Sequence, residues 1–301
     1  MEDKVELIGS SILKELQQIK LMQIEDKELN IIHTVCHCEK HGITGVGSDF
    51  NSELSIIKAR SEIIERFIYS QSKRILNSTS GLAVHSTISG AKENALKELI
   101  ERDLFLTSWF SGKYPDWTSP IVTKFPFKRI NGRFEVSIGH IGTCLDYQCY
   151  VYILSDRNNL FGAICGAVCE KRIEDSISKI LFDISRIQLI AKDFKKKGSN
   201  FFKKKQFKAS DHLEFYAAML KDNYINDYYT KISGEAIKLS LDKYSFINFK
   251  SDKCSPYSII ASYCSSPETQ NYFTGPASRK KINKLRITNP IPEVRLIHPL
   301  G

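Results

Sequence analysis

Two segments of the chain share the pattern Ala-x-x-Glu-x-x-Glu-Arg, and this repetition constrains the fold more than any other feature of the sequence. The first copy covers residues 59–66 and the second covers residues 95–102. Each copy follows a glycine-containing stretch, at residues 44–47 and 80–83. Self-similarity of this kind is typical of chains built from repeated supersecondary units. The sequence therefore predicts internally repeated strand-turn-helix units, with a weaker third copy at residues 178–186.

Each copy lies on a predicted amphipathic helix. In the helix expected over residues 52–70, one face carries polar side chains: Glu62, Glu65, Arg66 and Tyr69. The opposite face of this helix is apolar: Ile56, Ile57, Ile63, Ile64, Phe67 and Ile68. In the helix expected over residues 89–105, Glu98, Glu101 and Arg102 lie opposite four apolar side chains: Leu96, Leu99, Ile100 and Leu104.

The chemistry of these polar faces depends on whether they meet. A Glu–Arg pair on one helix is a common surface feature that contributes roughly 0.3 kcal/mol and needs no further explanation. Two matching helices favour a shared site, in which four carboxylates would repel one another. Mg²⁺ would relieve that repulsion, because it binds carboxylate oxygens together with water and phosphate oxygens. With arginine to bind phosphate, the residues predict a triphosphate clamp that is neither a P-loop nor a kinase glycine-rich loop.

The order of the predicted elements is that of an α/β (α+β) protein in which helices pack on sheets, in one domain over residues 1–301. Apolar periodicity predicts a helical N-terminal extension at residues 1–28 and further helices at 173–191 and 211–220. The remaining predicted elements are strands at 29–36, 134–140, 147–154 and 160–169, a glycine-rich turn at 42–47 and a Trp-rich loop at 107–135. The chain closes with a proline-containing tail, residues 286–301.

The composition is that of a globular protein, and the chain is expected to stay in the cytoplasm. No apolar run approaches the roughly 18 residues that a membrane span needs. The first residues do not have the pattern of an export signal, so the 8 cysteines are expected to be reduced thiols. The net charge of +9 is concentrated at residues 192–208. This basic, Phe-containing run would suit nucleic acid, but a solvated lysine-rich loop is the commoner origin of such a run, and nucleic acid is not an expected partner.

A group of soft metal ligands lies at residues 33–41, in the order His33-x-x-Cys36-His37-Cys38-x-x-His41. Cysteine and histidine at such close spacing could bind Zn²⁺. In a strand, however, Cys36 and Cys38 share one face while His37 points to the other. Two interpretations stay open: a structural zinc, and reduced thiols in the core.

The glutamate-rich segments resemble motifs of the YcaO family, ATP-dependent enzymes that modify peptide backbones. The first helix is similar to the family pattern Ser-x-x-x-Glu-x-x-Glu-Arg. Residues 79–83 and 98–103 are similar to its Ser-Asn-Gly-Leu-Ala and Glu-x-x-Glu-Arg-Asp patterns. Looser similarity extends to 211–216, 266–270 and 298–301. The resemblance implies a YcaO-like fold with ATP and Mg²⁺ as cofactors.

The resemblance also assigns roles to individual residues. It implies metal binding by four carboxylates: Glu62, Glu65, Glu98 and Glu101. It implies nucleotide contacts by six further residues: Lys58, Arg66, Ser80, Asn94, Arg102 and Arg186. It places catalysis at Arg102 and at the tail, where His298 and the Gly301 carboxylate would handle protons. For the tail, simple packing is an equal alternative.

Five positions of the motifs in this sequence depart from the family pattern. Lys58 replaces a serine, Ser80 replaces an asparagine, and Asn94 stands where glutamine or an acidic residue is common. The family's third motif, Glu-x-x-Gln, is replaced by Asp183-Ile-Ser-Arg186. These changes would either provide new phosphate contacts or reduce nucleotide use. The four central glutamates favour an active enzyme.

The activity implied by the resemblance is ATP- and Mg²⁺-dependent modification of a ribosomal precursor peptide. The first interpretation is a cyclodehydratase that forms thiazole or oxazole precursors, as in bacteriocin biosynthesis; backbone thioamidation and a catalytically inactive scaffold subunit are the alternatives. Expected partners are the precursor peptide and an E1-like or leader-peptide-binding protein, and a homodimer is a further option. The aromatic segment from Trp109 to Trp117 and residues 192–208 are candidate docking surfaces.

Overall fold

The structure is a computed structural model that describes residues 4–8, 18–76, 78–120, 125, 129–130, 134–156, 163–194, 234–251, 260–270, 283 and 287. Three regions named above lie largely or wholly outside these residues: the basic run at 192–208, the helix predicted at 211–220 and the tail at 286–301. No helix in the described part of the chain is both long enough and apolar enough to span a membrane.

The described residues form an ordered series of strands and helices. In the first part of the chain these are β1 (Lys4–Ile8), β2 (Ile19–Asp26), β3 (Ile31–Cys38), η2 (Glu39–His41), β4 (Ile43–Asp49), α2 (Ser52–Gln71), β5 (Leu82–His85) and α3 (Ile88–Ser111). The second part contains β6 (Arg129–Ile130), β7 (Phe134–Cys144), β8 (Tyr147–Asp156), β9 (Ala163–Glu170), α4 (Ile173–Phe194), β10 (Ile237–Leu239), β11 (Ser245–Ser251) and β12 (Ile260–Ser265).

The chain divides into two compact units, and the boundary between them falls within α3. Unit 1 comprises Met1–Leu99 and Asp242–Pro267, and unit 2 comprises Ile100–Leu241 and Glu268–Gly301. Both units are discontinuous in sequence, so no linker separates them. The single domain expected over residues 1–301 stays a prediction.

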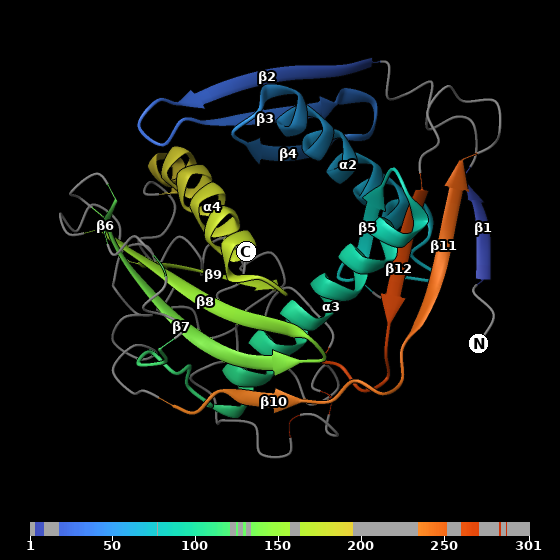
Figure 1. Cartoon of the computed structure of the whole chain (residues 1–301). Coiled ribbons are helices and arrows are strands. Elements are labelled where there is room, and N and C mark those ends of the chain that lie inside the picture. The colour runs from blue at the N-terminus through green and yellow to red at the C-terminus, as the bar shows by residue number, and fades with distance from the viewer. Residues whose placement is uncertain are drawn as a thin grey trace, which may run out of the picture. The chain divides into compact units, whose positions relative to one another are not determined.

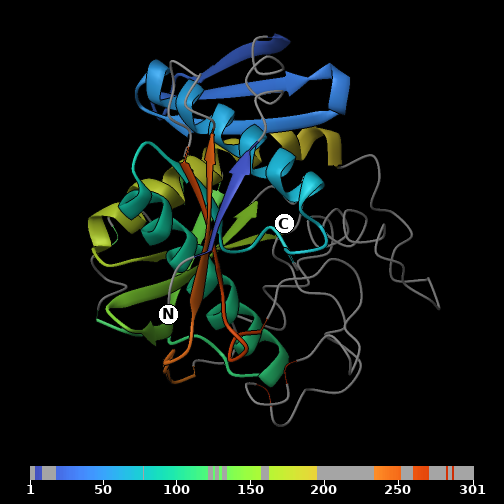
Figure 2. The same ribbon diagram turned by 90° about the vertical axis from the view of Figure 1, so that its right-hand side faces the viewer.

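Unit 1 contains two sheets, and α2 packs against both. The three-stranded sheet has the order β2-β3-β4 and is antiparallel throughout. The four-stranded sheet has the order β1-β11-β12-β5, with β1 parallel to β11 and the other pairs antiparallel. Helix α2 contacts β3 and β4 of the first sheet and β5 of the second. Figures 1 and 2 show α2 extending along the three-stranded sheet towards β5.

The glycines of β4 allow α2 to lie directly against this strand. A Cβ atom added at Gly47 would be 2.0 Å from the backbone oxygen of Ser55, and one added at Gly45 would be 2.2 Å from that of Ala59. The glycine-rich turn predicted at 42–47 is therefore wrong in its extent. Only Gly42 turns, with a φ of 62°, and the strand begins at the next residue.

Helix α2 confirms the predicted helix at 52–70 almost residue for residue. It begins where the Asn51 side chain accepts a hydrogen bond from the Leu54 N–H at 3.1 Å, which is an ordinary N-cap. Its buried apolar side chains include most of those predicted: Ile63, Ile64, Phe67 and Ile68. Ile57 is an exception, because 58% of it is exposed at the start of the helix.

The helical N-terminal extension predicted at residues 1–28 is wrong for the residues that the structure describes. Residues 4–8 and 19–26 are strands β1 and β2 instead. Every residue of β2 is paired with β3. Pairing with neighbouring strands therefore outweighs the helical spacing of the apolar residues, as tertiary context commonly does.

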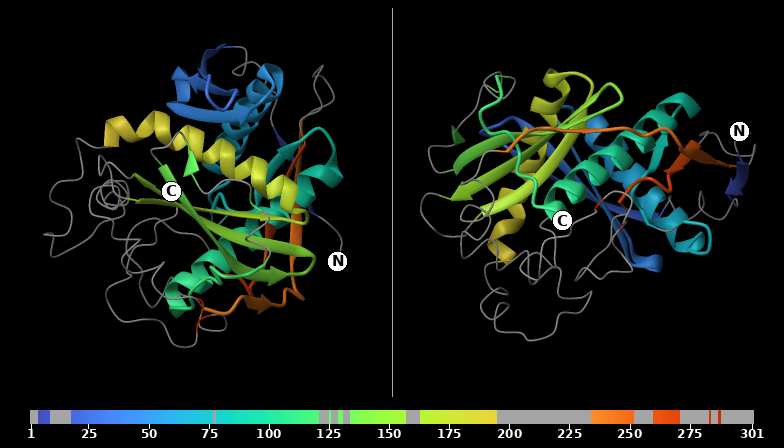
Figure 3. Two further views of the ribbon diagram at one scale, coloured as in Figure 1. Left: turned by 60° about the vertical axis from the view of Figure 1, so that its left-hand side comes forward. Right: turned by 90° about the horizontal axis from the view of Figure 1, so that it is seen from below.

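Unit 2 is built on a five-stranded sheet covered by a helix. The strand order is β10-β7-β8-β9, and β6 pairs with β7. Helix α4 packs on β8 and β9 and crosses the face of this sheet in Figure 3. The strands predicted at 134–140 and 147–154 and the helix predicted at 173–191 are thus confirmed as β7, β8 and α4, and the described part of the strand predicted at 160–169 is confirmed as β9.

The Trp-rich segment begins inside the helix α3 rather than in a loop. Helix α3 continues to Ser111, and Trp109 is only 1% exposed in the core, where it stacks on Phe105. Trp117 packs against Gly139 of β7. The predicted docking role is therefore wrong for Trp109, since a buried ring offers no surface to a partner. The described elements confirm an α+β protein with three sheets, whereas its construction from internally repeated strand-turn-helix units stays a prediction.

Candidate functional site

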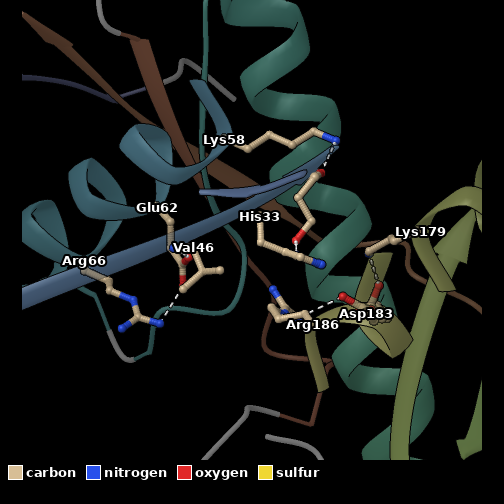
Figure 4. A network of polar contacts seen from close by, with 10 residues as sticks. His33, Val46, Lys58, Glu62, Arg66, Lys179, Asp183 and Arg186 are labelled. Atoms are coloured by element: carbon tan, nitrogen blue, oxygen red, sulfur yellow. Dashed lines mark hydrogen bonds and ion pairs between the residues drawn. The ribbon is translucent and has the colours of Figure 1, made fainter. Parts of the chain in front are cut away.

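Glu62 covers the free edge of β4 in unit 1. The Val46 N–H of this edge strand donates to Glu62 Oε2 at 2.5 Å. The other oxygen, Oε1, accepts from Arg66 Nη2 at 2.5 Å, one turn further along α2. Figure 4 shows the Glu62 side chain reaching Val46 and Arg66. Glu62 thus satisfies a strand edge and carries its own counter-ion.

Glu65 has the same position relative to β5, the edge strand of the four-stranded sheet. The Val84 N–H donates to Glu65 Oε1 at 2.9 Å. Burial raises the pKa of Glu65 well above its usual range, and the Glu98 carboxylate raises it further. The Val84 N–H and the Arg66 charge oppose this shift without cancelling it. Glu65 on α2 and Glu98 on α3 are therefore close enough to repel each other.

The donor set at Glu65 and Glu98 fits a hard divalent cation. Carboxylate oxygens are ligands that Mg²⁺ prefers, and a divalent cation offsets the repulsion between two neighbouring carboxylates. Within the described ranges, no group of three His, Cys, Asp or Glu residues is placed to hold a metal ion on protein ligands alone. A Mg²⁺ ion at Glu65 and Glu98 would therefore take further oxygen ligands from water and from phosphate, as it usually does.

Glu101 occupies a different electrostatic environment, in unit 2. This side chain is 7% exposed, and its Oε2 lies 2.7 Å from the Lys179 Nζ on α4. Burial opposes the charge on Lys179, but the carboxylates of Glu101, Asp183 and Glu170 together raise the pKa of this lysine above its usual value. The Glu101 carboxylate is therefore already neutralised by a cation of the protein itself.

The substituted third motif forms a second ion pair on α4. Arg186 Nη2 donates to Asp183 Oδ1 at 2.8 Å, and the pair is partly buried (Figure 4). Sequence reasoning singled out Asp183 and Arg186 but missed Lys179. The signal was present, because residues four and seven positions after Lys179 fall on the same helical face.

The other residues implied by the resemblance are placed as follows. Lys58 donates to Asp49 Oδ2 at 2.7 Å and to the Ser48 carbonyl at 3.1 Å, so it is held at the end of β4. Ser80 is buried beside Gly81, whose φ of 82° makes the turn into β5. Asn94 and Arg102 are partly buried on α3. His298 and Gly301 lie outside the described residues.

A buried carboxylate that sequence reasoning did not single out is Asp103. Its Oδ1 accepts hydrogen bonds from the Gln270 N–H at 2.6 Å and from the Thr107 hydroxyl at 3.4 Å. Gln270 Oε1 in turn accepts from the Asn283 N–H at 2.7 Å. Asp103 therefore anchors Gln270 to α3. The available signal was the loose family similarity of residues 266–270 together with the acidic residue directly after Arg102.

The close-spaced Cys and His residues of β3 do not form a zinc site. Cys36 is buried against Ala59 of α2. His33 and His37 point to the opposite face, where their Nδ1 atoms share hydrogen bonds of 2.8 Å with hydroxyls of β4. The cysteines of the described residues are buried free thiols, which confirms the interpretation as core residues.

Comparison with known protein families identifies the family to which this chain belongs. Residues 65–233 match the profile of a family described as YcaO cyclodehydratase, ATP- and Mg²⁺-binding. This chain belongs to the YcaO family. The match begins at Glu65 itself and includes Glu98, Glu101 and the ion pairs of α4. ATP and Mg²⁺ are thus the cofactors that the YcaO family description names, and they agree with the donor set at Glu65 and Glu98. A comparison with curated protein sequences found no match.

Solved structures show the same fold. A chain of the E. coli microcin synthetase McbBCD complex is 11% identical, with a TM-score of 0.57, over 83% of this chain and 88% of that one. The YcaO protein from Methanopyrus kandleri, bound with AMPPCP and Mg²⁺, is 9% identical, with a TM-score of 0.57, over 90% and 93%. A heterocyclase in complex with substrate and cofactor is 10% identical, with a TM-score of 0.55, over 93% of this chain and 54% of that one. At such low identity these matches show that the YcaO fold is shared.

Proposed function

We propose that this protein binds ATP with Mg²⁺ and uses it to modify backbone amides of a ribosomally made precursor peptide. Membership of the YcaO family supports the reaction class. The observation that carries the proposal is the placement of Glu98 near the buried Glu65, where burial and then the Glu98 carboxylate raise the pKa of Glu65; a divalent cation would offset this repulsion. Glu65 and Glu98 are the proposed Mg²⁺ ligands. Glu62 is a further candidate ligand, although Arg66 and Val46 already occupy both of its oxygens.

The polar residues of the family-like segments are the proposed nucleotide contacts. These residues are Lys58, Arg66, Ser80, Asn94, Arg102 and Arg186. Arg66 is suited to phosphate because its side chain is 51% exposed and its guanidinium can bind two oxygens at once. Arg102, between Glu101 and Asp103 on α3, is the proposed residue for stabilising charge during transfer. The tail residues His298 and Gly301 stay candidates for proton handling.

The proposed reaction is cyclodehydration. A Cys, Ser or Thr side chain of the peptide attacks the preceding amide carbonyl, and departure of the activated oxygen leaves an azoline ring. Mg²⁺–ATP, when bound, supplies the phosphoryl group that makes this oxygen a leaving group. The part of the protein is to position the phosphates and neutralise their charge, which dominates catalysis of phosphoryl transfer. Thioamidation would use the same activation with an external sulfur nucleophile.

Binding of a non-hydrolysable ATP analogue tests the proposal. We expect calorimetry to show binding that depends on Mg²⁺ in the wild-type protein. Glu65→Gln should weaken this binding at least tenfold, equivalent to about 1.4 kcal/mol, because it removes a charged metal ligand. The matched control is Glu53→Gln, an exposed glutamate in the first turn of the same helix. Equal affinities of Glu65→Gln and the wild type would contradict the proposed site.

Mass spectrometry of a co-expressed precursor peptide separates the two reactions. Loss of one water per modified residue supports cyclodehydration, and replacement of one oxygen by sulfur identifies thioamidation instead. We expect both to require the peptide together with an E1-like or leader-peptide-binding partner in the cytoplasm. Full activity of the purified chain alone would argue against such a partner.

The second candidate function is a catalytically inactive scaffold subunit. The observation that favours it is internal charge compensation, because Glu101 is paired with Lys179 and Asp183 with Arg186. A scaffold would bind its partner without releasing phosphate from ATP. Phosphate release that depends on precursor peptide would therefore rule out the scaffold. Absence of phosphate release in the assembled complex would favour it over the enzyme.

A further inference from the structure

The positively charged ammonium group of Lys179 lies next to Glu101, one of the glutamates that the family resemblance assigns to metal binding. Its Nζ lies 2.7 Å from Glu101 Oε2, and the Glu101 side chain is 7% exposed. A buried carboxylate with a charged partner at this distance has a strong, charge-assisted hydrogen bond. A Mg²⁺ ion at Glu101 would compete with this ammonium for the same carboxylate charge, and breaking a buried ion pair is costly.

Several carboxylates surround the ammonium group of Lys179, as carboxylates surround a bound metal ion. Besides Glu101, the carboxylates of Asp183 and Glu170 act on the same ammonium. Asp183 is shared with Arg186 at 2.8 Å, so this part of unit 2 has two positive and three negative side chains. The ammonium group of Lys179 offsets the repulsion between these carboxylates, as a bound metal cation would.

The Lys179 side chain is less buried than the carboxylate that it neutralises. The side chain is 36% exposed, whereas Glu101 beneath it is almost fully buried. An ammonium has three N–H donors, and Glu101 accepts from one of them. The remaining donor capacity can be offered to an anion that approaches from solvent. A lysine ammonium is a common ligand of phosphate, which it contacts as a point charge.

We infer that Lys179 takes the place of one divalent cation at Glu101: its ammonium neutralises this carboxylate and binds a phosphate oxygen of the nucleotide directly. Glu101 is then a positioning residue for Lys179 rather than a metal ligand. The inference rests on the proposed function, because it concerns the same nucleotide. It explains why a glutamate of a metal-binding motif is paired within the protein.

Counting bound Mn²⁺ separates a metal ligand from a positioning residue. The full chain is mixed with a non-hydrolysable ATP analogue and Mn²⁺, and bound Mn²⁺ per chain is measured by electron paramagnetic resonance. We expect Glu101→Gln to bind as many Mn²⁺ ions as the wild type, and Glu65→Gln to bind fewer. Loss of a Mn²⁺ ion in Glu101→Gln would overturn the inference. An unchanged count in Glu101→Gln, with weaker analogue binding, would support it.

A second measurement removes the metal altogether. In EDTA, the wild type should keep weak binding of the analogue through Lys179, and Lys179→Arg should keep it too. Lys179→Met should lower this residual affinity at least fivefold, because it removes the charge while keeping the length of the side chain. Equal residual affinity of Lys179→Met and the wild type would overturn the inference. The readout is binding, so it is independent of turnover.

The two proposals fail in different ways. If Glu101→Gln loses a Mn²⁺ ion while the wild type binds the Mg²⁺–analogue complex, only the role of Lys179 is wrong. If the wild type binds no analogue with or without metal, the proposed function and the role of Lys179 are both wrong. Circular dichroism of each variant confirms that it is folded, and Lys179→Arg provides the charge-preserving control.

Discussion

Glu62 and Glu65 lie on the same helix, and each accepts a backbone N–H from the edge of a different sheet. An unsatisfied N–H at such an edge costs about 1–3 kcal/mol, so both side chains have structural as well as chemical importance. Glutamine keeps an acceptor oxygen where alanine would not. Glu65→Gln therefore removes the carboxylate while keeping an acceptor for the Val84 N–H.

His140 provides a residue-scale test that is independent of the nucleotide site. It is 9% exposed on β7, with the Asp116 carboxylate and the Tyr150 ring as neighbours. Burial lowers the pKa of His140 below 6.5, and Asp116 offsets this only in part. As the pH falls below about 6.5, the unfolded chain therefore takes up a proton that the folded protein does not.

The free energy of unfolding should consequently decrease as the pH falls from about 7 to about 5.5, with a contribution from His140. His140→Gln removes this contribution, so the stability of the variant relative to the wild type should increase towards low pH. Urea unfolding of both proteins across this range measures the difference. A stability difference that is constant with pH would contradict the assigned environment of His140.

At the scale of elements, the contact between β4 and α2 determines where Glu62 can reach. The backbone oxygen of Ser55 lies 2.0 Å from the position that a Cβ on Gly47 would occupy. Any side chain there would push α2 away from the strand and lengthen the bond from Val46 to Glu62. The glycines of this segment thus serve helix–strand packing, and only Gly42 serves a turn.

Two glycine substitutions distinguish packing from backbone strain. Gly47→Ala should lower the free energy of unfolding by on the order of 2–3 kcal/mol, because a backbone atom stands in its way. Gly42→Ala meets no atom within 4 Å and has only its φ of 62° to oppose it, so its loss should be about 1 kcal/mol. Urea unfolding gives both values. A larger loss at Gly42 than at Gly47 would contradict the close packing of α2 on β4.

At the scale of the whole molecule, local patterns predicted the helices well and the first strands poorly. The apolar periodicity was sufficient for α2, which buries one face and exposes the other, and for the start of α3 and α4; the last turns of α3, residues 103–110, are buried on all sides, and this helix was predicted to end at residue 105. Residues 19–26 were mistaken for helix, because their structure depends on pairing with β3 rather than on their own spacing. The division of the chain within α3 could not be predicted either, since it follows from contacts between distant segments.

The residues of the candidate site could be predicted from the sequence, but the ion pairs that neutralise some of them could not. The repeated Glu-x-x-Glu-Arg pattern indicated Glu65 and Glu98, whose interaction is present in the structure. The same pattern made Glu101 equivalent to them, although Lys179 on a distant segment neutralises it. A pattern along one helix contains no information about the cation that another helix contributes.

The central claim is that Glu65 and Glu98 bind the same Mg²⁺ ion. A double-mutant cycle of Glu65→Gln and Glu98→Gln tests it, with the affinity for the Mg²⁺–analogue complex measured by calorimetry. If both ligate one ion, either single variant removes most of the Mg²⁺-dependent affinity, and the double variant is scarcely weaker than the singles. Losses that simply add, or no loss in either single variant, would contradict the account.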